Sequence, residues 1–219
     1  MSKIFLYHVD KSKIDESQLS VLESILSATE NKRFKKIKMI DARKNFILSR
    51  FLINKALMNF NCAQRFHIGR TIYGKPYLSP NPKNLKISIS HTRDIICLLI
   101  AKNIEFIGVD IEEKNRKINK KGIINFLYSP DEKLYLKTKD LYKNFFKYWT
   151  FKEAFTKALG KGLLIPFNQI SFSKKYQKYY VTSVPIDINS NTTGFIVCLD
   201  KNERSADINI NNVIIGGIK

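Results

Sequence analysis

The segment IGVDIEEKN, residues 107–115, is an apolar strand pattern that runs directly into three acidic residues. Asp110 and Glu112 are two positions apart, so on a strand both carboxylates leave the same face, while Glu113 lies on the other. Two neighbouring negative charges raise each other's pKa unless a cation stands between them. That cation could be a lysine or a metal ion. Taken alone, the segment favours a third interpretation, an exposed strand end with solvated acids.

The chain around this segment is strongly basic. It has 219 residues and a formal net charge of +19, from 38 Lys and Arg against 19 Asp and Glu. The basic excess favours anionic partners: nucleic acid, phosphorylated small molecules or an acidic protein. A general compositional drift towards lysine explains part of it, so charge alone does not choose between these partners. The hydrophobic share of 44% is enough for a core and argues against global disorder.

The sequence carries no sign of export or of a membrane span. No apolar run reaches the roughly 18 residues of a spanning helix, and the N-terminus lacks the longer apolar region of a signal peptide. Cys62, Cys97 and Cys198 are widely spaced and show no metal or redox motif, so we expect buried thiols. The sequence therefore predicts a cytoplasmic protein without membrane association.

The order of predicted elements indicates an α+β fold. Residues 3–9 are a predicted strand, followed by helical patterns over 15–39 and 41–60 and by an antiparallel meander of strands at 85–91, 94–101 and 105–112. Short helices at 120–128 and 130–137, a strong helix at 140–162 and a second meander reaching residue 200 follow, and the tail 201–219 has no assignment. We expect two similar, tightly packed α+β halves, 1–104 and 105–219, with antiparallel sheets, packed helices and the active site between them.

The strong helix carries a second group of polar residues. Trp149, Glu153 and Lys157 are spaced i, i+4, i+8 and share one face. An exposed Glu–Lys pair is worth only about 0.3–0.5 kcal/mol and would be unremarkable. The aromatic residues beside it indicate that this pair is at least partly buried. Lys152 and Lys161 are further cations, and the Gly-Lys-Gly stretch at 160–162 is either a plain helix end or a close approach to a ligand.

Two short segments upstream combine polar side chains with unusual backbone. Ser90 and His91 end a strand, where adjacent residues face opposite ways, so a Ser–His nucleophilic relay is improbable and phosphate contact fits better. A turn without a ligand is equally compatible with them. In YGKP, Pro76 pushes Lys75 into extended geometry and Gly74 permits an unusual φ, which frees main-chain groups to meet a flat polar ring. Alone, it is also an ordinary turn.

The order and spacing of these segments resemble a known family. GVDIE at 108–112 followed by WTFKEAFTKALGKGL at 149–163 resembles the two signature motifs of the 4′-phosphopantetheinyl transferases. YGKP and ISHT fall where that family has its Gly-Lys-Pro and Ser-His segments, and the helix SRFLINKAL at 49–57 is similar to the single-chain, surfactin-synthetase-activating (Sfp) type. The resemblance implies a pseudo-dimer of two similar halves. It also implies Mg²⁺-dependent transfer of 4′-phosphopantetheine from coenzyme A to a serine of an apo acyl or peptidyl carrier protein, with release of 3′,5′-ADP.

The resemblance also implies roles for individual residues. Asp110, Glu112 and Glu153 would ligate Mg²⁺, or alternatively Mn²⁺. Lys157 would contact the coenzyme A pyrophosphate, Lys75 with the Gly74–Pro76 backbone would hold the adenine end, and the remaining expected coenzyme-binding residues are Arg50, Ser90, His91, Asp110 and Lys152. The base that accepts the serine proton would be Glu153, or Glu112 acting through metal-bound water.

The resemblance also implies partners, and two other functions stand as alternatives to it. Acidic carrier proteins suit a basic surface, and two halves in one chain predict a monomer. A basic nucleic-acid-binding protein is the first alternative, although no reading motif is evident. A different metal-dependent phosphotransferase is the second, although P-loop and kinase-type glycine loops are absent. Basic residues at 32–38 with Arg43, Lys44 and Arg50 could bind phosphate or form a solvated helix face.

Overall fold

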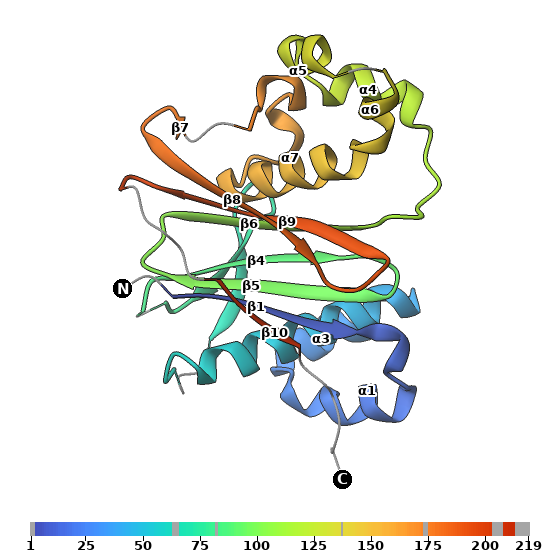
Figure 1. The fold of residues 1–219 in the computed structure, drawn as a ribbon. Helices are drawn as coiled ribbons and strands as arrows, with labels where there is room; N and C mark the ends of the chain where they lie inside the picture. Colours follow the sequence, from blue (N-terminus) through green and yellow to red (C-terminus); the bar gives the residue numbers. More distant parts are fainter. Residues whose placement is uncertain are drawn as a thin grey trace.

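Two four-stranded sheets pack face to face, and helices cover the outer face of each (Figure 1). The computed structural model describes residues 3–62, 66–81, 83–136, 138–172, 175–202 and 208–212. The strand orders are β10-β1-β5-β4 and β6-β9-β8-β7, and a separate hairpin pairs β2 with β3. The fold is therefore α+β, with mainly antiparallel sheets between packed helices, as the sequence predicts.

The first layer is built by the N-terminal part of the chain. Its strands are β1 (Lys3–Asp10), β4 (Leu85–His91) and β5 (Ile95–Lys102), its hairpin is β2 (His67–Arg70) with β3 (Pro76–Ser79), and its helices are α1 (Glu16–Leu22), α2 (Ala28–Lys35) and α3 (Ile40–Met58), with 3-10 turns at Lys11–Lys13 and Glu23–Ile25. The expected helix at 15–39 is thus divided. Ser27 and Glu30 form a capping box that starts α2 as a new helix.

The second layer follows residue 105. Its strands are β6 (Phe106–Glu113), β7 (Lys175–Tyr176), β8 (Tyr179–Asp187) and β9 (Thr192–Asp200), and its helices are α4 (Lys120–Leu127), α5 (Pro130–Tyr135), α6 (Thr138–Lys143) and α7 (Phe145–Leu159), with 3-10 turns at Gly162–Leu164 and Phe167–Gln169. The predicted helix at 140–162 is two helices, with Asn144 at the N-cap of α7. Gly160, at φ +69°, adopts the left-handed conformation that ends α7.

Strand alternation explains how the sheets bury both of their faces. On β5, Leu98 belongs to the core shared with α3, whereas Cys97 and Leu99 belong to the core between the two sheets. On β6, Val109 also faces the inter-sheet core, while Asp110 is turned towards α7. Three apolar layers therefore fix both sheets and leave the acids of β6 on the face that α7 covers.

The prediction of an antiparallel meander over residues 85–112 is wrong for the third strand, β6. β5 already pairs with β1 and β4, so both its edges are occupied, and β6 pairs instead with β9 in the second sheet. β6 lies beside β4, where the Oγ atoms of Ser88 and Ser90 accept hydrogen bonds from the backbone N–H groups of Val109 and Ile111, at 3.1 and 3.3 Å. Serine side chains thus join the edges of the two sheets.

The same connectivity occurs twice. The segment β1–α3–β4–β5 forms a sheet of order β1-β5-β4, and β6–α7–β8–β9 forms one of order β6-β9-β8. We propose that these are the two halves expected on either side of residue 104. The tail crosses this boundary, because β10 (Ile208–Asn212) pairs parallel with β1. Within the described residues, no helix is long and apolar enough to cross a membrane.

Candidate active site

The close approach of α7 to β6 brings the two groups of polar residues together. A Cβ on Gly108 would lie 1.9 Å from the carbonyl oxygen of Ala154 and 2.6 Å from the amide nitrogen of Ala158, so only glycine fits there. This contact lays the Glu153 and Lys157 face of α7 over the acidic end of β6. Gly108 thereby gives the strand motif and the helix motif a common site.

Asp110 is the centre of this site. It is buried, and its Oδ1 accepts hydrogen bonds from Lys157 Nζ at 2.6 Å and from Ser90 Oγ at 2.9 Å. Lys157 Nζ also donates to Ser90 Oγ at 3.0 Å. Asp110 Oδ2 is buried without a hydrogen-bond partner. A lysine therefore neutralises one side of the carboxylate and leaves the other side open to a further cation.

Two more carboxylates lie beside Asp110. Burial raises the pKa of Glu153 to about 7, with the negative charge of Asp110 as the next cause. Burial also raises the pKa of Glu112, whose Oε1 accepts from Arg116 Nη1 at 2.5 Å and from Trp149 Nε1 at 3.1 Å. Burial and mutual repulsion therefore disfavour the charged forms of both glutamates in this site.

These residues fit a hard divalent cation. Mg²⁺ prefers oxygen ligands, and the site offers three carboxylates, one of which, Asp110, has an Oδ2 without a hydrogen-bond partner. In the described part of the chain, no three His, Cys, Asp or Glu side chains are already arranged around one metal position. Arg116 and Trp149 hold Glu112 in this structure.

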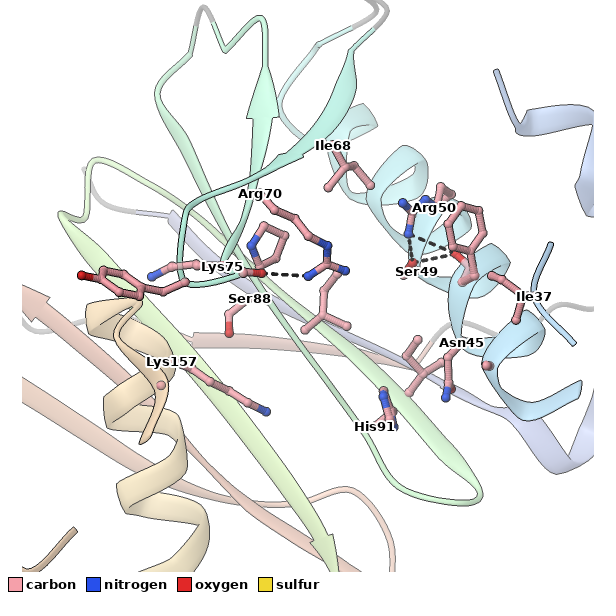
Figure 2. A pocket seen from close by; sticks show the side chains of 18 of the residues that line it. Ile37, Asn45, Ser49, Arg50, Ile68, Arg70, Lys75, Ser88, His91 and Lys157 are labelled. Atoms are coloured by element: carbon pink, nitrogen blue, oxygen red, sulfur yellow. Dashed lines mark hydrogen bonds between the residues drawn. The ribbon is translucent and has the colours of Figure 1, made fainter. Parts of the chain in front are cut away.

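A cavity of about 580 Å³ opens next to the carboxylates, between α3, the β2–β3 hairpin, β4 and the end of α7 (Figure 2). The predicted coenzyme-binding residues that line it are Arg50, Gly74, Lys75, Pro76, His91 and Lys157. Lys157 both lines the cavity and contacts Asp110, so it connects the two parts of the site.

Lys75 joins the hairpin to α7. Its Nζ donates to the carbonyl oxygens of Ala158 and Ile107, the latter at 3.2 Å, and burial lowers its pKa to about 8. A Cβ on Gly160 would lie 2.9 Å from Lys75 Cδ, so the glycine that ends α7 also admits this lysine. The Lys75 ammonium group is therefore a structural link as well as part of the cavity wall.

Comparison with known proteins finds a similarity over the segment that holds the candidate site. The family model described as the 4′-phosphopantetheinyl transferase superfamily matches residues 106–203, the segment from β6 to just beyond β9 that holds the three carboxylates and Lys157. This part of the chain is thus similar to the 4′-phosphopantetheinyl transferase superfamily.

Curated relatives agree with this assignment. The chain is 27% identical over 168 residues to "4'-phosphopantetheinyl transferase gsp" of Aneurinibacillus migulanus, covering 74% of this chain and 68% of that protein. It is 34% identical over 120 residues to a 4′-phosphopantetheinyl transferase of Bacillus subtilis, covering 52% and 50%, and 33% identical over 131 residues to "4'-phosphopantetheinyl transferase ffp" of the same organism, covering 58% and 53%. It thus spans about half the length of these last two relatives.

Lys152 lies outside the lining of the candidate coenzyme cavity. The side chain is fully buried and donates to Glu132 Oε2 at 2.5 Å and to the carbonyl oxygen of Leu127 at 2.7 Å. Because it lies five positions before Lys157 on α7, it points to the α4–α5 side of the helix and away from the cavity. The structure thus places Lys152, an expected coenzyme-binding residue, in the contact between α7 and α5 and not at the cavity.

Two other expected coenzyme residues are occupied by protein contacts. Ser90 Oγ donates to Asp110 and accepts from the backbone N–H of Ile111, so it orients the acid rather than reaching the cavity. Arg50 is buried, pairs with Glu30 Oε1 at 3.1 Å and lies over the ring of Phe46. Neither interaction was evident in the sequence, because the partners come from other elements.

The basic segment at 32–44 contributes no cation to the cavity wall, which it touches only through Ile37, Met39, Asp41 and Ala42. Arg43 lies over the ring of Phe34, and Lys44 Nζ donates to the carbonyl oxygen of Ile14 at 2.8 Å. Sequence reasoning instead missed Arg70, which lines the cavity and donates to Gly74 O. Its signal was an arginine four residues before the glycine of YGKP.

Proposed function

We propose that this protein transfers 4′-phosphopantetheine from coenzyme A to a serine hydroxyl of an apo acyl or peptidyl carrier protein and releases 3′,5′-ADP. The main support for this proposal is the position of Lys157 between the two parts of the site. Lys157 joins three carboxylates at one end to a cavity lined by cations at the other. A polyanion with a pyrophosphate fits such a site, with its pyrophosphate beside the carboxylates and its nucleotide in the cavity.

Asp110, Glu112 and Glu153 would hold Mg²⁺, with Mn²⁺ as a second candidate. The metal, when bound, neutralises negative charge on the pyrophosphate oxygens. Lys157 approaches from α7 and adds a fixed positive charge next to Asp110. Ser90 holds the Asp110 carboxylate in place, which keeps one of its oxygens directed away from Lys157.

The carrier serine oxygen attacks the β-phosphorus of coenzyme A, forming a new P–O bond. The bond from the β-phosphorus to the bridging oxygen breaks, and 3′,5′-ADP leaves with that oxygen. Glu153 would accept the serine proton, with Glu112 as the alternative base, because both are largely buried carboxyl groups beside Asp110. Lys157 stabilises the charge that develops on the leaving group.

Carrier proteins of this kind are acidic helical bundles, and the net charge of +19 favours their encounter. We further propose a monomeric, cytoplasmic enzyme that binds neither nucleic acid nor membranes. Two layers of equivalent connectivity in one chain support the monomer, because they supply the two halves that a homodimer would otherwise bring together.

Intact-mass measurement of apo carrier proteins tests this function. The protein is incubated with Mg²⁺, coenzyme A and carriers from fatty-acid, polyketide and peptide synthesis. We expect at least one carrier to gain the mass of one phosphopantetheine group. No transfer to any carrier, combined with tight, salt-sensitive binding of DNA or RNA, would favour the nucleic-acid-binding alternative instead.

A further inference from the structure

Two cations contact the carboxylates of the site, and the protein holds them differently. Lys157 Nζ donates to both Asp110 Oδ1 and Ser90 Oγ, so two groups fix it. Arg116 Nη1 donates to Glu112 Oε1 at 2.5 Å, and its side chain is half exposed. The inference here rests on the metal site of the proposed function and concerns this second cation.

The backbone around Arg116 does not depend on its side chain. Arg116 follows a turn at the end of β6, and its backbone N–H donates to the carbonyl oxygen of Glu113 at 3.0 Å. The backbone N–H of Lys114 donates to the carbonyl oxygen of Asn191 at 2.7 Å and ties the turn to the chain before β9. The guanidinium group can therefore leave Glu112 and move into solvent without a change in the strand.

Glu112 would not remain alone if Arg116 moved away. Trp149 Nε1 donates to the same Oε1 atom at 3.1 Å, and its ring packs on the rings of Phe145 and Phe167. The tryptophan supplies a hydrogen bond but no charge, and the Glu112 side chain is only 14% exposed. Because a largely buried carboxylate without a cation is costly, Arg116 leaves most easily when another cation replaces it.

We propose that Arg116 is a displaceable counter-ion of the metal site, which neutralises Glu112 when no metal is bound and which a divalent cation must displace. A metal ion and a guanidinium group that approach the same carboxylate repel each other strongly at contact distance. Of the two cations, Lys157 is fixed by two partners, whereas Arg116 has solvent to move into. Arg116 thus lowers the affinity of the site for the metal.

Titration with Mg²⁺, and separately with Mn²⁺, tests this role without any transfer reaction. Calorimetry gives the affinity, and fluorescence shows whether the metal reaches Glu112, because its donor Trp149 is the only tryptophan of the chain. Arg116→Gln removes the charge and keeps a donor for Glu112.

Lys117→Gln is the matched control. Lys117 is the next residue, it is exposed, and its substitution changes the net charge equally. Among the residues that the structure describes, no ion pair joins Lys117 to a carboxylate. The control therefore separates the contact with Glu112 from the general effect of charge.

We expect Arg116→Gln to bind the metal about fivefold more tightly than wild type, and Lys117→Gln to differ from wild type less than about twofold. Equal tightening in both variants would reduce the effect to net charge and overturn the proposal. Unchanged or weaker binding by Arg116→Gln would overturn it too, since Arg116 would then support the metal ligand. A metal that binds without changing the Trp149 emission binds away from Glu112, which is a third contradicting result.

The same titration separates this inference from the proposed function. If none of the three proteins binds a divalent cation, the metal site of the transferase fails and the counter-ion role fails with it. If Arg116→Gln binds the metal more tightly but wild type modifies no carrier, the counter-ion role stands and the transferase does not.

Discussion

Individual residues decide what the acidic site can do. Asp110 Oδ1 accepts hydrogen bonds from both Lys157 and Ser90, whereas Asp110 Oδ2 has no hydrogen-bond partner. The strand period and the helix period in the sequence were sufficient to predict that Asp110, Glu112, Glu153 and Lys157 gather on facing surfaces. The role of Ser90 could not be predicted in that way, because it depends on β6 lying beside β4 rather than beside β5.

Glu153 should make the stability of the metal-free protein depend on pH. Its folded-state pKa is raised to about 7, so this group contributes stability below its ordinary pKa near 4.5, and that contribution is lost as the pH rises through 7. Thermal melts in a chelator should therefore show wild type losing stability relative to Glu153→Gln between pH 5 and pH 8. Melting temperatures of the two proteins that run parallel across this range would contradict the shifted pKa.

At the scale of elements, the site depends on how closely α7 packs on β6. Gly108→Ala places a methyl group 1.9 Å from the Ala154 carbonyl oxygen, so helix and strand must separate. Overpacking of this kind costs about 1–3 kcal/mol, and we expect that loss in denaturant unfolding, together with weaker Mg²⁺ binding. Gly122→Ala in α4 is the control, because its Cβ meets nothing closer than 3.8 Å, and it should stabilise by up to about 1 kcal/mol. Unchanged stability of Gly108→Ala would show that the packing is looser than described.

Lys152 connects α7 to α5 and should matter for folding, not for coenzyme binding. Lys152→Met leaves the Glu132 carboxylate without its cation in a largely buried place, a change that typically costs about 3–5 kcal/mol. Adding Glu132→Gln should recover most of this loss. Calorimetry on the folded double variant should give the wild-type affinity for coenzyme A. A large loss of affinity would indicate that Lys152 does take part in coenzyme binding.

At the scale of the whole molecule, the sequence predicted the α+β class and most elements but not the sheet partners. Hydrophobic periodicity identifies strands and helices, whereas pairing depends on contacts between distant segments. β6 joining β9 and β10 returning to β1 are both of this kind. The same limit explains why the cation-rich segment at 32–44 was linked to the ligand and Arg70 was not, since only the folded hairpin brings Arg70 to the cavity.

The net charge of +19 should affect the encounter with an acidic carrier more than the chemistry. Attraction between exposed charges is screened within about 8 Å at physiological ionic strength. Raising NaCl from about 50 to 500 mM should therefore increase KM for the carrier several-fold and change kcat much less. A KM for the carrier that does not respond to salt would indicate that the basic surface serves another purpose.

The central claim is that Asp110 and Glu153 belong to a metal-dependent transfer site for coenzyme A. Its most direct test is the intact mass of an apo carrier after incubation with coenzyme A and either wild type, Asp110→Ala, Glu153→Ala or Glu113→Gln, each with Mg²⁺ and with a chelator. Glu113 is the matched control, because it lies on the opposite strand face and accepts a hydrogen bond from the backbone of Arg93. We predict that wild type and Glu113→Gln add one phosphopantetheine group only with Mg²⁺ and that the other two variants add none. Wild-type rates in Asp110→Ala and Glu153→Ala would contradict the account.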